Sequence, residues 1–285
     1  MSRSPKLLNP ETLRKLNQET FDSTGFFFFL RADSPVLRAS QEGRDSFHAL
    51  VATLYCVYAD YSKGHIDKCF KDEFLPPDLK GDTAFIDKRD QAREHFKSVR
   101  RGLRQGLLHG HFPDTGTRRQ LVESLRDLGL LARTGRKKDW QAILNEIGNI
   151  KKKEWIEARE RLCDQSDLLY EYLDEWKNGW AQASPSLREG IYEQFFRADW
   201  IDENFLTDII IGISAPGKAP RAPKALAAAH KTELAAAIRD KYLAREFSDP
   251  EQIYDELKKR AAFILEPPKT SSLEKSRESD FGFPK

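Results

Sequence analysis

The sequence predicts an all-α fold, and three observations carry that prediction. Apolar residues recur at steps of three and four along most of the chain, which is the spacing of one buried helix face. No stretch of useful length alternates apolar and polar residues as a half-buried strand does. Of the 285 residues, 39% are hydrophobic, which is enough for a substantial core. We therefore expect a helical bundle.

The first helix is expected from Asn9 to about Glu19. Asn9 can cap the helix, Pro10 suits the first helical position, and Glu11 lies near the positive end of the helix dipole. The apolar run Phe26–Leu30 comes next. It fits either a buried strand or an apolar plug, and periodicity does not distinguish the two.

Longer amphipathic helices are expected over 40–62 and 83–109, followed by helical segments around 121–131, 140–147 and 152–183 and a helical pair over 187–213. The helix over 83–109 is expected to end where Gly110 and Pro113 interrupt the pattern. The expected inward residues of the first two are Phe47, Leu50, Val51, Leu54, Tyr55, Tyr58, Phe85, Ile86, Phe96, Val99, Leu103, Leu107 and Leu108.

Prolines and composition divide the chain into four expected parts. The helical bundle covers 1–214, and a proline-rich linker covers 215–223. An alanine-rich helix and a second helix, which Ser248 or Asp249 can cap, form a small C-terminal hairpin over 224–266. The polar and charged segment 267–285 is expected to be a disordered tail.

Charge and cysteine content limit the functional classes. The 47 basic and 45 acidic side chains nearly cancel, so any contact with nucleic acid needs a local basic face. Cys56, Cys69 and Cys163 are scattered, lack metal-site spacing and fit ordinary thiols of a reducing cytosol. The run Phe26–Leu30 is too short for a signal peptide or a membrane span. We expect a cytoplasmic protein without a metal or other cofactor.

The most informative stretch covers residues 100–113 and joins fixed positive charge to two imidazoles. Arg100, Arg101 and Arg104 cannot lose their protons at working pH, whereas His109 and His111 titrate near neutrality. An arginine and a histidine together can neutralise a phosphate and move a proton without a metal. These are the requirements for RNA cleavage through the 2′-hydroxyl.

This stretch resembles the HEPN superfamily, whose signature is an arginine, four to six residues, and a histidine. Arg104 and His109 have four residues between them, and Arg104 and His111 have six. Arg89 and His95 also meet the spacing, which we interpret as a coincidence. The resemblance is concentrated in the first half of the chain. Members of the family usually carry Asn, Asp or His after the arginine, where this chain has Gln105.

The resemblance implies a metal-independent endoribonuclease in phage defence or acting as a toxin, with RNA as substrate, a homodimeric assembly and an antitoxin or regulatory partner. His109 would act as general base or acid, Arg104 would stabilise charge on the phosphoryl oxygens, and Gln105 would orient the histidine or hold an oxygen. His111 is the alternative imidazole. The expected contacts to RNA phosphates are Arg100, Arg101, Lys151 and Lys152.

Helix geometry adds a condition to this site. At about 100° per residue, Arg104 and His109 would lie about 140° apart on one α-helix and would not face the same phosphate. The helix must therefore break near Gly106 or Gly110, or a second copy of the chain must complete the site.

The alternative function is a non-catalytic, all-α HEPN-like scaffold or interaction protein. In that case the arginines form a solvated helix face, and the histidines lie at the C-terminal end of a helix, where the helix dipole favours cations. The aromatic residues of the later helices could stack bases, but core packing explains their helical spacing better. They are Trp155, Tyr170, Tyr172, Trp176, Trp180, Phe195, Phe196 and Trp200.

Overall fold

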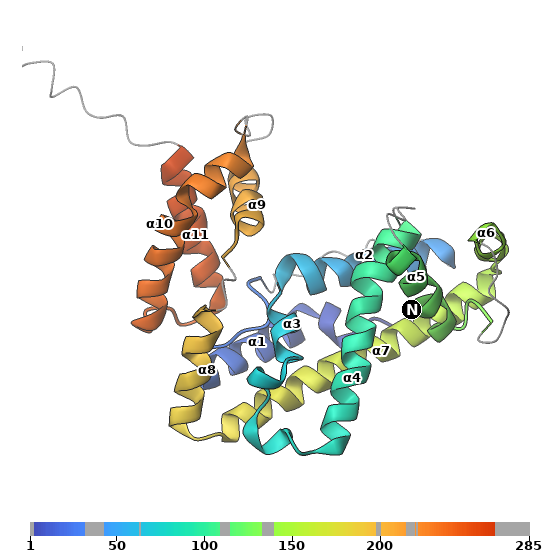
Figure 1. The fold of residues 1–285 in the computed structure, drawn as a ribbon, viewed down its shortest axis with the longest axis horizontal. Helices are drawn as coiled ribbons and strands as arrows, with labels where there is room; N and C mark the ends of the chain where they lie inside the picture. The colour runs from blue at the N-terminus through green and yellow to red at the C-terminus, as the bar shows by residue number, and fades with distance from the viewer. Residues whose placement is uncertain are drawn as a thin grey trace, which may run out of the picture. The chain divides into compact units, whose positions relative to one another are not determined.

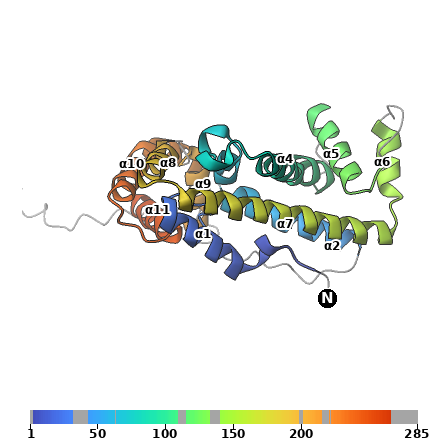
Figure 2. The ribbon, with the colours of Figure 1, turned by 90° about the horizontal axis from the view of Figure 1, so that it is seen from below.

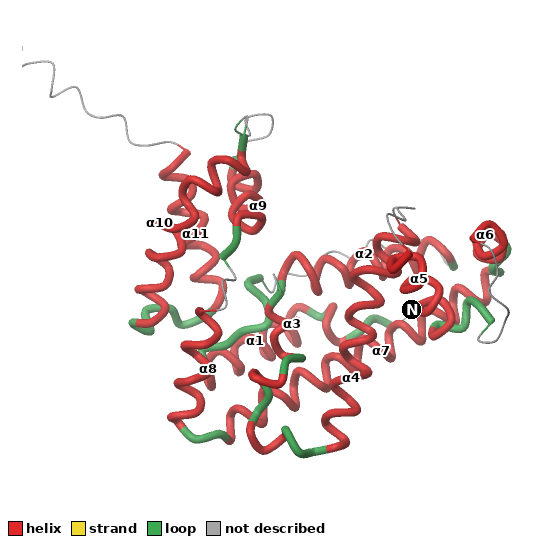
Figure 3. The backbone as a smooth tube through the Cα atoms, viewed as in Figure 1, coloured by secondary structure: helices red, strands yellow, loops and turns green. Residues whose placement is uncertain are grey.

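The computed structural model describes residues 3–31, 43–62, 64–108, 115–132, 140–197, 201–214, 220 and 222–265, with the backbone alone at 195–197. Over these residues it consists of helices and loops without a strand (Figure 3), so the all-α prediction is confirmed for the described chain. The α-helices are α1 (Pro10–Thr24), α2 (Arg44–Tyr55), α3 (His65–Cys69), α4 (Thr83–Lys97), α5 (Thr115–Asp127), α6 (Trp140–Gly148), α7 (Lys152–Gln182), α8 (Pro185–Arg197), α9 (Glu203–Ile213), α10 (Pro223–Leu243) and α11 (Pro250–Leu265).

Two π-helical segments interrupt this α-helical pattern. The segment η2 (Cys56–Tyr61) continues α2, and η5 (Ser98–Leu108) continues α4. Short 3-10 turns complete the described structure at η1 (Lys6–Leu8), η3 (Asp72–Phe74) and η4 (Pro77–Leu79). The helices expected over 40–62 and 83–109 are therefore present but change their winding partway, which apolar spacing did not indicate.

The chain divides into two compact units. The first comprises Met1–Trp200 with Arg245–Gln252, and the second comprises Ile201–Ala244 with Ile253–Lys285. The helix α9 therefore belongs with the C-terminal helices, whereas sequence analysis assigned everything up to residue 214 to the bundle. The expected linker falls mainly on 215–219 and 221, and the expected tail on 267–285, all outside the described residues.

The long helix α7 organises the first unit. In Figures 1 and 2 it runs beside α1, α2 and α4, and all three pack against it. Trp155, Tyr172, Trp176 and Trp180 on α7 are each at most 5% exposed, so core packing is confirmed for these four aromatic residues. Burying an aromatic side chain of this size contributes about 2–3 kcal/mol, so these four residues stabilise the first unit substantially.

The run Phe26–Leu30 forms a buried loop, which we call the plug. All five residues are at most 1% exposed, and none belongs to a helix or strand. Phe26 lies 4.9 Å and Phe28 5.5 Å from Trp176, measured between ring centroids. The plug interpretation is therefore right and the strand interpretation wrong.

A buried asparagine makes the plug possible. The backbone N–H groups of Phe28 and Phe29 both donate to Asn17 Oδ1 at 3.0 Å, and Asn17 Nδ2 donates to Phe29 O at 2.6 Å. The N–H of Leu30 donates to Tyr61 O at 2.9 Å. Buried backbone groups need such partners because they have left water. Residues of α1 and η2 thus supply the bonds that a neighbouring strand would supply in a sheet.

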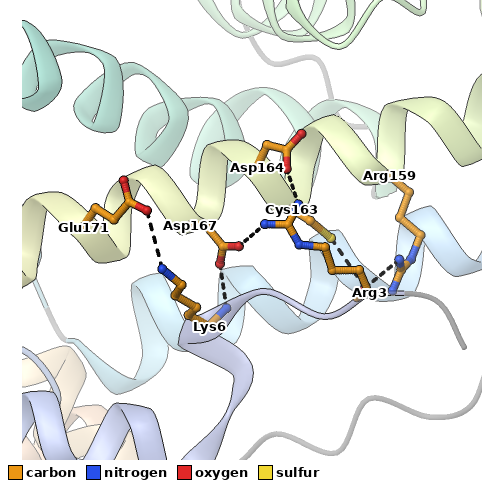
Figure 4. Close-up of polar contacts among 7 residues, drawn as sticks. All are labelled: Arg3, Lys6, Arg159, Cys163, Asp164, Asp167 and Glu171. Carbon is orange, nitrogen blue, oxygen red and sulfur yellow. Dashed lines mark hydrogen bonds and ion pairs between the residues drawn. The ribbon is translucent and has the colours of Figure 1, made fainter.

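The N-terminal segment is held on α7 by charge, as Figure 4 shows. Asp164, Asp167 and Glu171 lie at steps of three and four, so they share one side of α7. Arg3 pairs with both aspartates, and Lys6 Nζ lies 3.4 Å from Glu171 Oε1. The backbone N–H of Lys6 also donates to Asp167 Oδ1 at 2.7 Å. The basic N-terminus therefore has a structural role on an acidic helix side.

Smaller side chains build the second unit. The buried residues of α9 are Phe205, Leu206, Ile209 and Ile210, and those of α10 are Ala227, Leu234, Ile238 and Tyr242. The helix α10 packs against α9. The helix α11 begins at Pro250, directly after Asp249, which is one of the two expected caps. Asp249 Oδ1 accepts from the Gln252 N–H at 2.9 Å.

Candidate functional site

The arginines of the Arg–His motif lie on η5, and the two histidines lie outside the described residues. Arg100, Arg101, Arg104 and Gln105 are all placed on this segment, where it continues α4. His109 and His111 belong to 109–114, which the structure does not describe. The pairing of Arg104 with either imidazole therefore stays a prediction.

The winding of η5 changes the geometric expectation for this motif. Hydrogen bonds in a π-helix join residues i and i+5, so residues five apart lie nearly above one another. The angle of about 100° per residue that separates Arg104 from the position five residues later belongs to an α-helix. The α-helical angle does not apply within η5, which ends at Leu108. Because His109 lies outside the described residues, the expected helix break or second copy of the chain stays a prediction. The homodimer remains a prediction from the resemblance.

Two glycines let α5 approach η5 closely. A Cβ at Gly102 would lie 2.6 Å from Ser124 Oγ and 2.9 Å from Gln120 O, and a Cβ at Gly106 would lie 2.9 Å from Leu121 Cδ2. Side chains at these positions would push α5 away. The glycine side of η5 is therefore its packing side, which leaves Arg101 and Gln105 exposed.

The groove along α5 has the wrong charge for RNA. It lies where α4 and η5 meet α5, has a volume of about 470 Å³ and carries Glu94, Glu123 and Asp127 against one cation, Arg126. Carboxylates repel phosphate, since both are anions. The exposed side with Arg101 and Gln105 is the better candidate for contact with RNA.

Arg100 and Arg104 lie four residues apart and have different surroundings. The Arg100 guanidinium pairs with Asp67 on α3 and lies 5.1 Å from the centroid of the Phe96 ring. The Arg104 guanidinium lies 5.0 Å from the centroid of the Tyr55 ring, and no described carboxylate pairs with it. Arg100 was expected to bind RNA phosphate, but its charge is compensated within the protein. Within the described part of the chain, the charge of Arg104 is therefore uncompensated.

The other residues expected to contact RNA lie on two different elements. Arg101 and Gln105 are exposed and make no hydrogen bond or ion pair with the described part of the chain. Lys151 and Lys152 are exposed at the start of α7, where Lys151 precedes the first turn. The candidate site therefore gathers Arg101, Arg104 and Gln105 on one segment, with the two lysines on another element.

A second polar cluster, which sequence reasoning missed, lies inside the bundle. Tyr58 Oη is 3.0 Å from His95 Nε2 and 2.5 Å from Ser166 Oγ, and His95 Nδ1 is 3.3 Å from Gln165 Oε1. Burial lowers the pKa of His95 to about 4, so the imidazole is neutral at pH 7. The members of the cluster come from three helical elements that are distant in the sequence, η2, α4 and α7, and spacing carries no signal for such a cluster.

This buried cluster does not serve as a site for a macromolecule. Tyr58 is 0% and His95 4% exposed, so RNA cannot reach them. Arg89, which matches the motif spacing with His95, pairs instead with Asp72 and Asp90. Arg89 and His95 therefore have different partners among the described residues.

Metal ligands do not gather in the described residues. No group of three or more His, Cys, Asp or Glu side chains is placed to hold an ion within the parts of the chain that the structure describes. Cys56, Cys69 and Cys163 are free thiols, and burial raises the pKa of each. Their thiolate fraction at neutral pH is therefore low, which does not suit a nucleophile.

Among the described helices, none has the length and apolar character needed to cross a membrane. Comparisons of this chain with models of known protein families, with curated protein sequences and with solved structures find no match.

Proposed function

We propose that this protein is a metal-independent endoribonuclease of the HEPN type. The observation that carries the proposal is the charge of Arg104, which no described carboxylate compensates. Arg104 lies on a π-helical segment, five residues before His109 in the sequence. π-Helical turns are rare and occur often at functional sites. Arg101 and Gln105 add an exposed cation and an exposed amide beside it.

The proposed reaction needs only the groups of this motif. His109 removes the proton from a 2′-hydroxyl, and the 2′-oxygen attacks the adjacent phosphorus. The bond from phosphorus to the 5′-oxygen breaks, and that oxygen receives a proton from an imidazole. Arg104 stabilises the negative charge that grows on the phosphoryl oxygens. The products carry a 2′,3′-cyclic phosphate and a 5′-hydroxyl, and DNA is not cut because it lacks the nucleophile.

The test is cleavage of end-labelled RNA in EDTA by the wild type, by three variants of the motif and by two control variants. Arg104→Ala and His109→Ala are expected to lower the rate by about 100-fold or more. His111→Ala shows whether the second imidazole contributes. Arg239→Ala and His230→Ala, both on α10, are matched controls expected to retain the wild-type rate. No cleavage at all, or equal cleavage by every variant, would sink the assignment.

A mixing experiment tests the proposed homodimer. Arg104→Ala and His109→Ala proteins are each expected to lose most of the activity. A dimer of one with the other regains one intact pair when the two residues act across the interface. Partial recovery of cleavage after mixing supports a composite site. Continued inactivity, with dimers present by size, would place each site within one chain.

The second candidate is a non-catalytic scaffold, and the pairing of Arg100 with Asp67 favours it. An arginine whose charge is paired within the protein has a structural role and is not available to a phosphate. The cleavage assay separates the two candidates. A role in phage defence or as a toxin belongs to the first proposal, and cell growth on induction of the wild type and of His109→Ala tests it.

A further inference from the structure

Tyr55 is the only described partner of the Arg104 side chain. It is the last residue of α2, and α2 packs along η5. Unlike Tyr58, which is fully buried and hydrogen-bonded, Tyr55 is half-buried, and its hydroxyl makes no hydrogen bond with the described residues. Tyr55 therefore contacts Arg104 through its ring and not through its hydroxyl.

A ring holds an arginine in a different way from a carboxylate. In an ion pair such as Arg100 with Asp67, the carboxylate takes up a guanidinium donor and offsets the positive charge. A cation–π contact leaves the charge in place, and the N–H groups at the edge of the guanidinium plane stay available. Arg104 is thus oriented and remains able to bind a phosphate with two donors.

The neighbouring arginine provides an internal comparison. Both guanidinium groups lie about 5 Å from an aromatic ring centroid, at 5.1 Å for Arg100 with Phe96 and 5.0 Å for Arg104 with Tyr55. Only Arg100 also has a carboxylate partner among the described residues. The two surroundings differ by one acidic side chain, and that difference separates an arginine that stabilises the fold from one that can meet a ligand.

We infer that Tyr55 is a positioning residue, whose ring holds the Arg104 guanidinium with its N–H groups free for the scissile phosphate of RNA. This inference rests on the proposed ribonuclease function. It predicts that an aromatic ring is needed at position 55 and that the tyrosine hydroxyl is not.

The experiment compares Tyr55→Phe with Tyr55→Leu in the RNA cleavage assay. Tyr55→Phe keeps the ring and is expected to retain wild-type kcat and KM. Tyr55→Leu removes it, and we expect kcat to fall by about 10-fold to 100-fold with little change in KM, because a misplaced charge affects the transition state most. Tyr254→Leu is the matched control, since Tyr254 lies under Lys258 on α11 and is expected to leave both constants unchanged.

A spectroscopic measurement on the resting protein separates positioning from folding. The ring current of Tyr55 is expected to shift the side-chain NMR signals of Arg104 upfield in the wild type and in Tyr55→Phe, but not in Tyr55→Leu. Equal melting temperatures of the variants exclude a general loss of structure.

The outcomes distinguish the two proposals. Absence of RNA cleavage by the wild type overturns the ribonuclease and this inference together. Cleavage that depends on Arg104 but is the same in the wild type and Tyr55→Leu overturns only the inference. A loss in Tyr55→Phe equal to that in Tyr55→Leu also overturns it, because the hydroxyl would then be the required group.

Discussion

The plug and the exposed side of η5 depart from the α-helical pattern in opposite ways. In the plug, Asn17 satisfies backbone groups of Phe28 and Phe29, and the side chains are buried. On η5, Arg101 and Gln105 are exposed without partners among the described residues. The backbone groups of Phe28 and Phe29 are hydrogen-bonded within the protein, whereas the side chains of Arg101 and Gln105 remain available to a ligand. This difference separates an irregular segment that stabilises the fold from one that suits a ligand.

The strongest test of the comparison removes the hydrogen bonds of the plug. Asn17→Ala leaves two N–H groups and one C=O group buried without partners, and we expect the free energy of unfolding to fall by about 4 kcal/mol. Urea denaturation measures the change. Asn178→Ala on the exposed side of α7 is the matched control, expected to change stability by less than about 0.5 kcal/mol. Similar effects of the two substitutions would mean that Asn17 does not support the plug.

The buried histidine cluster predicts a loss of stability in acid. The pKa of His95 is lowered to about 4 in the folded protein, below its unfolded value near 6.5, so the unfolded chain binds more protons between these values. Stability therefore falls as pH drops through this window, by about 3 kcal/mol in total. Burial also lowers the pKa of His65 and His48, which acts in the same direction.

The contribution of His95 is measured by comparing urea denaturation at several pH values with that of His95→Gln. The glutamine keeps a hydrogen-bonding group for Tyr58 but does not titrate, so its stability should depend less on pH between 4 and 6.5. An unchanged pH dependence would assign the acid sensitivity to other groups.

The packing of α5 on η5 predicts a smaller effect. Gly102→Ala places a methyl group 2.6 Å from Ser124 Oγ, and we expect about 2 kcal/mol of destabilisation from overpacking. Gly190→Ala in α8 meets nothing within 4 Å and is expected to stabilise by about 0.5–1 kcal/mol, because alanine favours helix. Effects of the same sign at both positions would contradict the close approach at Gly102.

The smallest expected effect on stability belongs to the exposed side of η5. Arg101→Gln should change the free energy of unfolding by less than about 0.5 kcal/mol. It should lower the dependence of RNA affinity on salt by about one charge, if Arg101 meets a phosphate. Arg239→Gln on α10 is the control with no expected change in either property. A lost salt dependence in both variants would indicate general electrostatic attraction instead of a site on η5.

Local signals predicted most of the helices, but they did not predict the winding. Asn9 accepts from the N–H groups of Glu11 and Thr12 at 2.9 and 3.2 Å, as its position before a proline indicated. Most of the expected inward residues, such as Leu54 and Leu103, are fully buried, whereas Tyr55, Ile86, Leu107 and Leu108 are half-buried. The π-helical winding of η2 and η5 was not predicted, because apolar steps of three and four tolerate a locally wider turn. The candidate site was predicted as a motif, while the partner of Arg104 was not.

The sequence by itself determined the helical class and the main helix starts, because caps and apolar spacing act between neighbours in the chain. Only the tertiary structure decided that Phe26–Leu30 is a plug, that Arg100 is paired with Asp67 and that Arg104 lies on Tyr55. These outcomes depend on which distant segments meet. Tyr55 and Arg104 come together through the packing of α2 on η5, and no spacing within either segment encodes that contact.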